Sequence, residues 1–205
     1  MIAIIDYGMG NLHSVAKAFE KAGAETAIVA QAAELRKAEA VVLPGVGAFG
    51  QGMANLRARG FVSAIQDIVE TGTPLIGICL GLQLLFAESE EMGEYRGLGL
   101  FPGRVRRLPK SLRVPHVGWN QIHPVRPSPV LAGIAEGSYA YFVHSYYADP
   151  ADSSLVLATT DYGLDFASVV GRDRIYGLQF HPEKSQSVGL RILQNIVQSL
   201  KRGAL

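Results

Sequence analysis

The single cysteine of the chain, Cys79, lies between two glycines, with Gly77 two residues before it and Gly81 two residues after it. The apolar run before it is typical of a buried strand, and the residues after it, LQLLFAES, predict a helix. This layout is that of a nucleophile elbow, a sharp strand-to-helix turn that exposes its central side chain. Free cysteine is also among the most buried residue types, and on this segment alone the two interpretations are about equal.

A nucleophilic cysteine needs a base that takes its proton and a group that orients the base. Among the histidines, only His181 has a carboxylate two residues further on, Glu183, in the sequence QFHPEKS. If the preceding strand continues, positions 181 and 183 share one face with roughly 7 Å between their α-carbons. Pro182 favours the extended backbone that this requires. The alternative is a surface turn at a strand end, but the elbow and the oriented histidine strengthen each other.

Another glycine-rich segment, VVLPGVGAFG at 41–50, reads as a strand followed by a turn. Its glycines match a dinucleotide-binding pattern, which expects an acidic residue at the end of the next strand, about 20 residues on. The acidic residues near that distance, Asp67 and Glu70, fall inside a helical pattern. The glycines are better suited to presenting backbone N–H groups to an oxyanion formed when Cys79 attacks a carbonyl.

The elements that must position these residues alternate along the first half of the chain. Short apolar runs predict strands at 2–6, 26–30, 40–44 and 74–79. Helical patterns follow the N-cap Asn11, up to Gly23, and cover 52–59 and 61–71. Continuous apolar strands that alternate with helices predict a parallel sheet covered on both faces.

From about residue 98 the pattern changes to shorter strands, such as YAYFVHSYY and SLVLATT, which we expect to pair antiparallel. Residues 166–183 predict a hairpin with its turn at Arg172-Asp173. Residues 187–200 predict a closing amphipathic helix with one apolar stripe, formed by Val188, Ile192, Ile196 and Leu200. Because no linker, repeat or low-complexity tract interrupts the chain, we predict one domain, residues 1–205.

Composition excludes several classes of function. A formal net charge of +1 gives no general attraction to nucleic acid or to a membrane surface. One cysteine permits no intramolecular disulfide and fits a reducing compartment. The amino terminus, MIAIIDYGMG, lacks the features of a signal peptide, and the longest apolar run, near 74–87, is too short to span a bilayer. We therefore expect a cytoplasmic protein, with no metal and no cofactor.

The segments GICLGLQLLF, PGVGAF and QFHPE together resemble the class I, or triad-type, glutamine amidotransferases, in the same order and over essentially the whole chain. The resemblance implies a flavodoxin-like α/β fold and hydrolysis of glutamine to glutamate and ammonia. Cys79 would attack the side-chain amide, and His181 would protonate the departing ammonia and then activate water. Glu183 would orient His181. Backbone N–H groups at Gly47 and Leu80 would form the oxyanion hole.

The same resemblance implies a set of substrate contacts. Gln83 and Glu91, one and three helical turns beyond the nucleophile, match positions that hold the amino-acid head group of glutamine. Ser145 and Tyr146 match the remaining contacts. Taken alone, Gln83 is simply a polar interruption in a buried helix.

Within this family, three segments resemble the glutaminase subunits of imidazole glycerol phosphate synthases, namely HVGWN (116–120), YFVHSY (141–146) and QFHPEKS (179–185). This implies a heterodimer with a (β/α)8 cyclase subunit, which uses the ammonia to convert PRFAR into imidazole glycerol phosphate and AICAR in histidine biosynthesis. The residues expected to face that partner are Asn11, Trp119 and Lys184. The alternative for Trp119 is that it is a core residue.

Two other interpretations use the same residues differently. A cysteine hydrolase, or the glutaminase subunit of a pyridoxal phosphate synthase, would keep the triad, although HVGWN and YFVHSY argue against the latter. A nucleotide-binding module would use GVGAFG and leave Cys79 buried. A run of basic residues without intervening acids could bind phosphate or an acidic partner, but we favour a solvated rim; its members are Arg104, Arg106, Arg107, Lys110 and Arg113.

Overall fold

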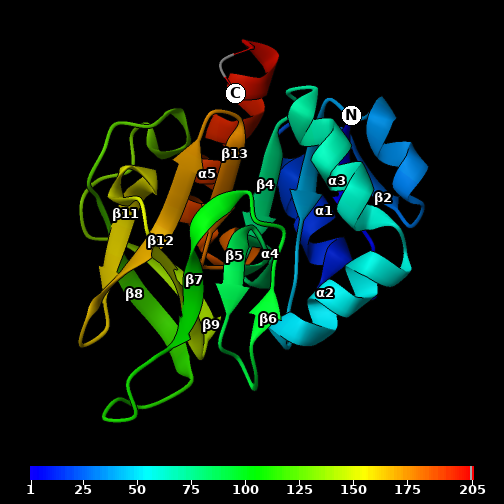
Figure 1. Ribbon diagram of the computed structural model, residues 1–205. Helices are drawn as coiled ribbons and strands as arrows, with labels where there is room; N and C mark the ends of the chain where they lie inside the picture. The colour runs from blue at the N-terminus through cyan, green and yellow to red at the C-terminus, as the bar shows by residue number, and fades with distance from the viewer. Residues whose placement is uncertain (204) are drawn as a thin grey trace.

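The computed structural model describes residues 1–203 and 205 as a layered α/β structure (Figure 1). The strands are β1 (Ile2–Ile5), β2 (Thr26–Val29), β3 (Ala40–Leu43), β4 (Leu75–Ile78), β5 (Phe86–Ser89), β6 (Tyr95–Arg96), β7 (Phe101–Arg107), β8 (His116–Pro124), β9 (Ser138–His144), β10 (Tyr146–Pro150), β11 (Val156–Asp161), β12 (Asp165–Arg172) and β13 (Ile175–Leu178). The α-helices are α1 (Leu12–Lys21), α2 (Phe49–Ala58), α3 (Phe61–Glu70), α4 (Leu80–Leu84) and α5 (Gln186–Lys201). Short 3-10 helices are η1 (Ala32–Lys37), η2 (Pro129–Leu131), η3 (Ser153–Leu155) and η4 (Pro182–Lys184).

The large sheet has the strand order β2-β1-β3-β4-β13-β12-β11-β8-β9. The neighbours from β2 to β13 pair in parallel, as buried strands with intervening helices do. The strands from β12 to β9 continue the sheet with antiparallel pairs. A smaller sheet has the order β10-β7-β5-β6. The predicted fold class, a mostly parallel central sheet with antiparallel strands added in the second half, is confirmed.

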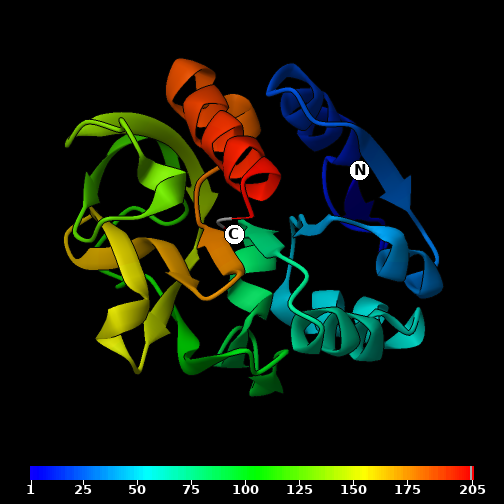
Figure 2. The same cartoon turned by 90° about the horizontal axis from the view of Figure 1, so that it is seen from above.

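Two apolar cores cover the two faces of the parallel strands, because successive side chains of a strand point to opposite faces. On β1, Ile2 and Ile4 belong to the core beneath α1 and α5. Ala3 and Ile5 belong to the core beneath α2 and α3. Figure 2 shows the sheet lying between these two helix pairs. The helices thus hold the parallel strands from both sides and leave their carboxyl ends open.

The first and last helices form as their patterns predict. The side-chain oxygen of Asn11 accepts a hydrogen bond from the N–H of Ser14 at 3.4 Å, which caps α1. Gly23, with a φ of +95°, follows its end. Ile192 and Ile196 of α5 are buried in the core. None of the helices among the described residues is long and apolar enough to cross a membrane.

Two local predictions are wrong. The helix predicted from LQLLFAES ends at Leu84, because the N–H groups of Leu98 and Leu100 bond to the carbonyl oxygens of Leu84 and Leu85 at 2.9 Å and draw the chain into strand β5. The hairpin turn lies one residue later than predicted. Arg172 pairs with Ile175, which leaves 173–174 as the turn.

The turn between β4 and α4 depends on two glycines. A methyl group on Gly81 would overlap the carbonyl oxygen of Leu43 at the end of β3. A methyl group on Gly77 would lie 2.7 Å from the backbone of Gly81 and of Leu82. Protein side chains do not tolerate such approaches to backbone, so both positions require glycine.

We predict that Gly81→Ala destabilises the protein by about 3 kcal/mol or more, because the obstructing atoms are backbone and cannot move aside. The measurement is urea unfolding followed by circular dichroism. Gly52→Ala is the matched control: a methyl group there would contact Leu80 and Leu84 side chains at an ordinary 3.4 Å, and alanine favours the helix by up to about 1 kcal/mol. Equal stabilities for the two variants would contradict the steric explanation.

Candidate active site

Three neighbouring strands bring the predicted catalytic segments together. β3, β4 and β13 lie side by side and run parallel, so their carboxyl ends meet at one edge of the sheet. The glycine-rich turn follows β3, Cys79 follows β4, and His181 comes three residues after the end of β13. Open α/β sheets place their ligand sites at this edge.

Cys79 has the strained backbone of a nucleophile elbow. Its φ of 55° and ψ of −110° lie outside the regions that residues with a side chain normally occupy. The residue is 6% exposed, and its sulfur lies 3.8 Å from the carbonyl oxygen of Val143 on β9. Observed strain of this kind occurs where the surrounding structure enforces it, here the close approach at Gly77 and Gly81.

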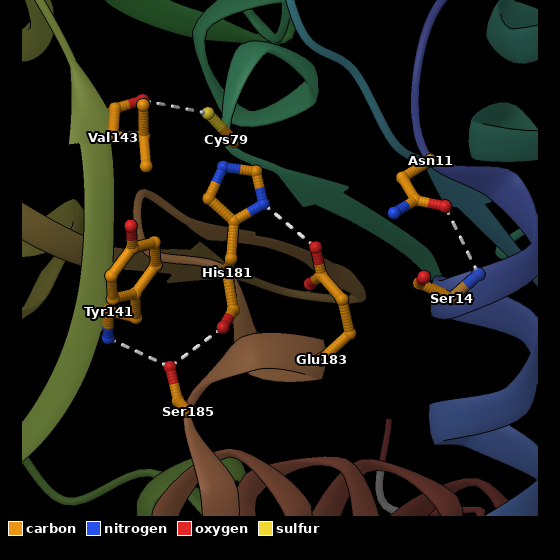
Figure 3. Close-up of polar contacts among 8 residues, drawn as sticks. All are labelled: Asn11, Ser14, Cys79, Tyr141, Val143, His181, Glu183 and Ser185. Carbon is orange, nitrogen blue, oxygen red and sulfur yellow. Dashed lines mark hydrogen bonds and ion pairs between the residues drawn. The ribbon is translucent and has the colours of Figure 1, made fainter. Parts of the chain in front are cut away.

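His181 and Glu183 form a buried pair beside the cysteine. The Nδ1 atom of His181 lies 2.8 Å from Oε1 of Glu183, and the two side chains are 5% and 3% exposed. Figure 3 shows the other ring nitrogen turned toward Cys79. The prediction assumed that the two residues lie on a continued strand, but they lie at the start of η4. The 3-10 turn folds Glu183 back under the imidazole, which a straight strand would not do.

Three hydrogen bonds fix the backbone of His181 against β9. Its N–H donates to the carbonyl oxygen of Tyr141 at 2.9 Å. The N–H of Tyr141 donates to Oγ of Ser185, also at 2.9 Å, and the Ser185 hydroxyl donates to the carbonyl oxygen of His181 at 2.7 Å (Figure 3). Sequence reasoning missed Ser185, because nothing in QFHPEKS reveals which strand lies opposite.

The surroundings of His181 favour its protonated form. Burial alone would lower the pKa of this imidazole, but the contact with Cys79 and the hydrogen bond to Glu183 outweigh burial and raise it to about 10. The ring is therefore an imidazolium at neutral pH. It can donate a proton to the leaving group of a carbon atom that the Cys79 sulfur attacks.

A cavity of about 180 Å³ opens in front of the cysteine and the histidine. Its volume equals that of about six liquid waters, which suits a molecule the size of an amino acid. The residues that line it are Val46, Gly47, Cys79, Leu80, Gln83, Glu91, Val143, His144, Tyr146, His181 and Lys184. Most of the sequence-predicted catalytic and substrate residues thus meet at one cavity.

The two predicted oxyanion donors come from two segments, the start of α4 and the turn after β3. Leu80 is the first residue of α4, where backbone N–H groups have no partner within the helix. Gly47 has a φ of +103°, and a methyl group there would lie 2.8 Å from the terminal carbon of Met9. Both residues line the same cavity as Cys79.

Gln83 and Glu91 both reach the cavity, but not from one helix. Gln83 lies one turn beyond Cys79 on α4, as predicted. Glu91 does not lie three helical turns on, because α4 ends at Leu84 and Glu91 follows strand β5. Its Oε2 atom accepts a hydrogen bond from the N–H of Phe49, the first residue of α2, at 2.8 Å. Partial burial raises the pKa of Glu91, and this hydrogen bond opposes the rise.

The remaining predicted residues lie around the cavity mouth or apart from it. Tyr146 lines the cavity, whereas Ser145, between two lining residues, does not. Lys184 is exposed at the rim. Trp119 on β8 is 46% exposed and packs edge-on against Tyr141, with ring centroids 5.8 Å apart, so its alternative as a core residue is wrong. Asn11 is exposed at the start of α1.

The basic run on β7 and beyond is partly neutralised. Arg104 pairs with Glu88 at 3.0 Å, and Arg106 pairs with Asp149 at 2.6 Å. Both partners come from neighbouring strands of the small sheet. These pairs support the interpretation of the run as a solvated rim.

A model of the class-I glutamine amidotransferase family matches residues 3–199. The HisH subunit of imidazole glycerol phosphate synthase from Syntrophotalea carbinolica is 55% identical over 202 residues, which cover 95% of this chain and 98% of that one. The HisH subunit from Moorella thermoacetica is 53% identical, over 95% of this chain and 92% of its own. In fold, the chain is similar to a solved glutamine amidotransferase structure, with a TM-score of 0.78 at 20% identity over 98% of this chain and 100% of that one. The chain therefore belongs to the class I glutamine amidotransferases, and within them to the HisH subunits of imidazole glycerol phosphate synthase.

Proposed function

We propose that this chain, acting as a single cytoplasmic domain, hydrolyses glutamine with a Cys79-His181-Glu183 triad. It passes the ammonia to a (β/α)8 cyclase subunit that makes imidazole glycerol phosphate and AICAR from PRFAR. The observation that carries the proposal is the strained Cys79 beside an imidazole whose far nitrogen is held by a buried carboxylate. The relatives named HisH, similar over nearly the whole chain, support the same function.

The chemistry follows from the positions of these groups. With the thiol proton of Cys79 on His181, the sulfur attacks the amide carbon of glutamine, and the oxygen takes up negative charge between the N–H groups of Gly47 and Leu80. His181 donates its proton to the nitrogen, the C–N bond breaks, and ammonia leaves a thioester behind. His181, now neutral, takes a proton from water, whose oxygen attacks the thioester carbon. The C–S bond then breaks, which releases glutamate and leaves the proton on His181 and the sulfur free for the next attack. Glu183 keeps the imidazole in one orientation throughout.

An exposed apolar surface beside the cavity supports the proposed partner. Cross-strand pairing places Val117 opposite Val143 and Trp119 opposite Tyr141, on one face of β8 and β9. Val117, Trp119 and Val143 are 55%, 46% and 36% exposed. Val143 also lines the cavity, so this surface, together with Lys184 at the rim, borders the way out for ammonia. A partner bound there receives ammonia without its passing through water. Asn11 is proposed to face the same partner.

We predict that Cys79→Ser lowers glutamine-dependent synthase activity of the complex by about 10³-fold or more, because the hydroxyl is a far weaker nucleophile here. Activity with an ammonium salt in place of glutamine remains at the wild-type level, since the cyclase receives its substrate directly. The measurement is formation of imidazole glycerol phosphate with each nitrogen source. Full glutamine-dependent activity in this variant would refute the triad and favour the interpretation of Cys79 as a core residue.

We predict that Glu183→Gln lowers kcat for glutamine hydrolysis by about 10²-fold or more, because the imidazole loses its orienting carboxylate. The variant also removes a negative charge that stabilises the imidazolium, so the pKa of His181 falls. The alkaline limb of the kcat–pH profile, where the proton donor is lost, therefore moves to lower pH. Glu25→Gln makes the same chemical change at an exposed site and leaves the profile unchanged. An unshifted limb in Glu183→Gln would exclude this electrostatic role.

We predict that Trp119→Ala weakens binding of the cyclase subunit by about 10- to 100-fold, as truncation of a central aromatic residue does at interfaces. Titration calorimetry with the purified cyclase subunit measures the change in Kd. Ile28→Ala is the control, since Ile28 is 38% exposed on β2, at the opposite edge of the sheet. Equal Kd values for the two variants would place the interface elsewhere.

A further inference from the structure

Two buried histidines outside the triad connect the cavity to strand β8. Nε2 of His144 lies 2.9 Å from Nδ1 of His116, and Nδ1 of His144 lies 2.9 Å from the carbonyl oxygen of Tyr146. Nε2 of His116 lies 3.3 Å from Nδ2 of Asn120. The triad does not use these residues, and their contacts arise from the register of β8 against β9, which places His116 opposite His144.

Backbone groups at both ends determine every proton in this chain of contacts. The carbonyl oxygen of Tyr146 only accepts, so Nδ1 of His144 carries the hydrogen. Because burial, supported by the charge of His181, lowers the pKa of His144 to about 3, its ring is neutral and Nε2 accepts from His116. Burial lowers the pKa of His116 to about 4, so Nε2 of His116 accepts from Asn120 in turn.

The far end is fixed in the same way. Nδ2 of Asn120 also donates to the carbonyl oxygen of Asp161 at 2.9 Å, and Oδ1 of Asn120 accepts from the N–H of Gln121 at 2.8 Å. The ring of His116 is held between Tyr162 and Phe142, stacked with centroid distances of 4.0 and 5.0 Å. The donors therefore all point toward the cavity, and the two aromatic rings hold the plane of the His116 imidazole.

This series of hydrogen bonds ends at Gln83. The carbonyl oxygen of Tyr146, which accepts from His144, also accepts from Nε2 of Gln83 at 2.8 Å. The second hydrogen on Nε2 goes to Oε1 of Gln179 at 3.2 Å. Both amide hydrogens of Gln83 are thus directed away from the cavity. Among the described residues nothing bonds to its Oε1 atom, and since Gln83 lines the cavity, this oxygen is what it offers a ligand.

We propose that Asn120, His116 and His144 are positioning residues that hold Tyr146 and Gln83 so that the Gln83 carbonyl oxygen accepts a hydrogen bond from the α-ammonium group of the substrate. The proposal rests on the proposed glutaminase function. If these hydrogen bonds were broken, the carbonyl oxygen of Tyr146 would lose the donor that holds it against His144, although it would still accept from Gln83. Gln83 would then move with Tyr146, and its Oε1 atom would lie farther from the α-ammonium group of the substrate.

The test compares His116→Leu with His116→Asn in complex with the cyclase subunit. Leucine removes the donor, whereas the amide of asparagine places a donor close to where Nδ1 of the imidazole lies. The substrates are glutamine and 4-carbamoylbutanoate, the analogue without the α-amino group. We expect His116→Leu to lower kcat/KM for glutamine by about 10-fold, mostly through KM, and to leave kcat/KM for the analogue unchanged. We expect His116→Asn to restore the discrimination between glutamine and the analogue. Equal losses for both substrates, or none, would overturn the proposal.

A second measurement is independent of activity and of the folding of any variant. Long-range ¹H–¹⁵N spectra of the wild-type chain, labelled at histidine, report which ring nitrogen carries the proton. We expect the neutral Nδ1–H form for both His116 and His144 at pH 7. The Nε2–H form in either ring would refute the proposed series of hydrogen bonds. A wild-type complex without glutaminase activity would instead refute the proposed function. The spectra would still decide whether the hydrogen bonds from Asn120 through His116 and His144 to Tyr146 exist.

Discussion

The close approach of the β4–α4 turn to the end of β3 is the constraint on which the rest of the site depends. Gly81 lies against the carbonyl oxygen of Leu43, so the chain can turn only if positions 77 and 81 carry no side chain. The residue between them then takes a φ of 55°. A side chain in that conformation cannot lie in the strand or in the helix, so Cys79 projects at the edge of the sheet.

The parallel register of the sheet supplies what the turn alone does not. Because β13 pairs with β4 residue by residue, the segment after β13 arrives beside the segment after β4. Ser185 then fastens His181 to β9, whose carbonyl at Val143 faces the sulfur. Three segments that are well separated in sequence, around Cys79, Val143 and His181, are therefore held within one small cavity. Their relative positions depend on the core on both faces of the sheet rather than on loops.

The sequence predicts those features that depend on neighbouring residues. The elbow, the N-cap at Asn11 and the apolar strands all follow from local spacing, and the fold class follows from their alternation. Contacts across strands are not visible in the same way. The end of α4 at Leu84 depends on hydrogen bonds from Leu98 and Leu100, and the pairing of His116 with His144 depends on the register of β8 with β9. Both features are determined by residues that are not neighbours in the sequence.

The buried histidines around the cavity show why partners, and not burial, decide what each ring does. Burial acts on all of them in the same direction, lowering the pKa of the imidazole. His181 faces the Cys79 side chain and a carboxylate, which favour the imidazolium, so it keeps its proton. The polar partners of His144 are a carbonyl oxygen and another neutral ring, and the charge of His181 further disfavours its protonation. The proton carried by the first ring thus helps to keep the second one neutral, so that one histidine is available for proton transfer and its neighbour for orientation.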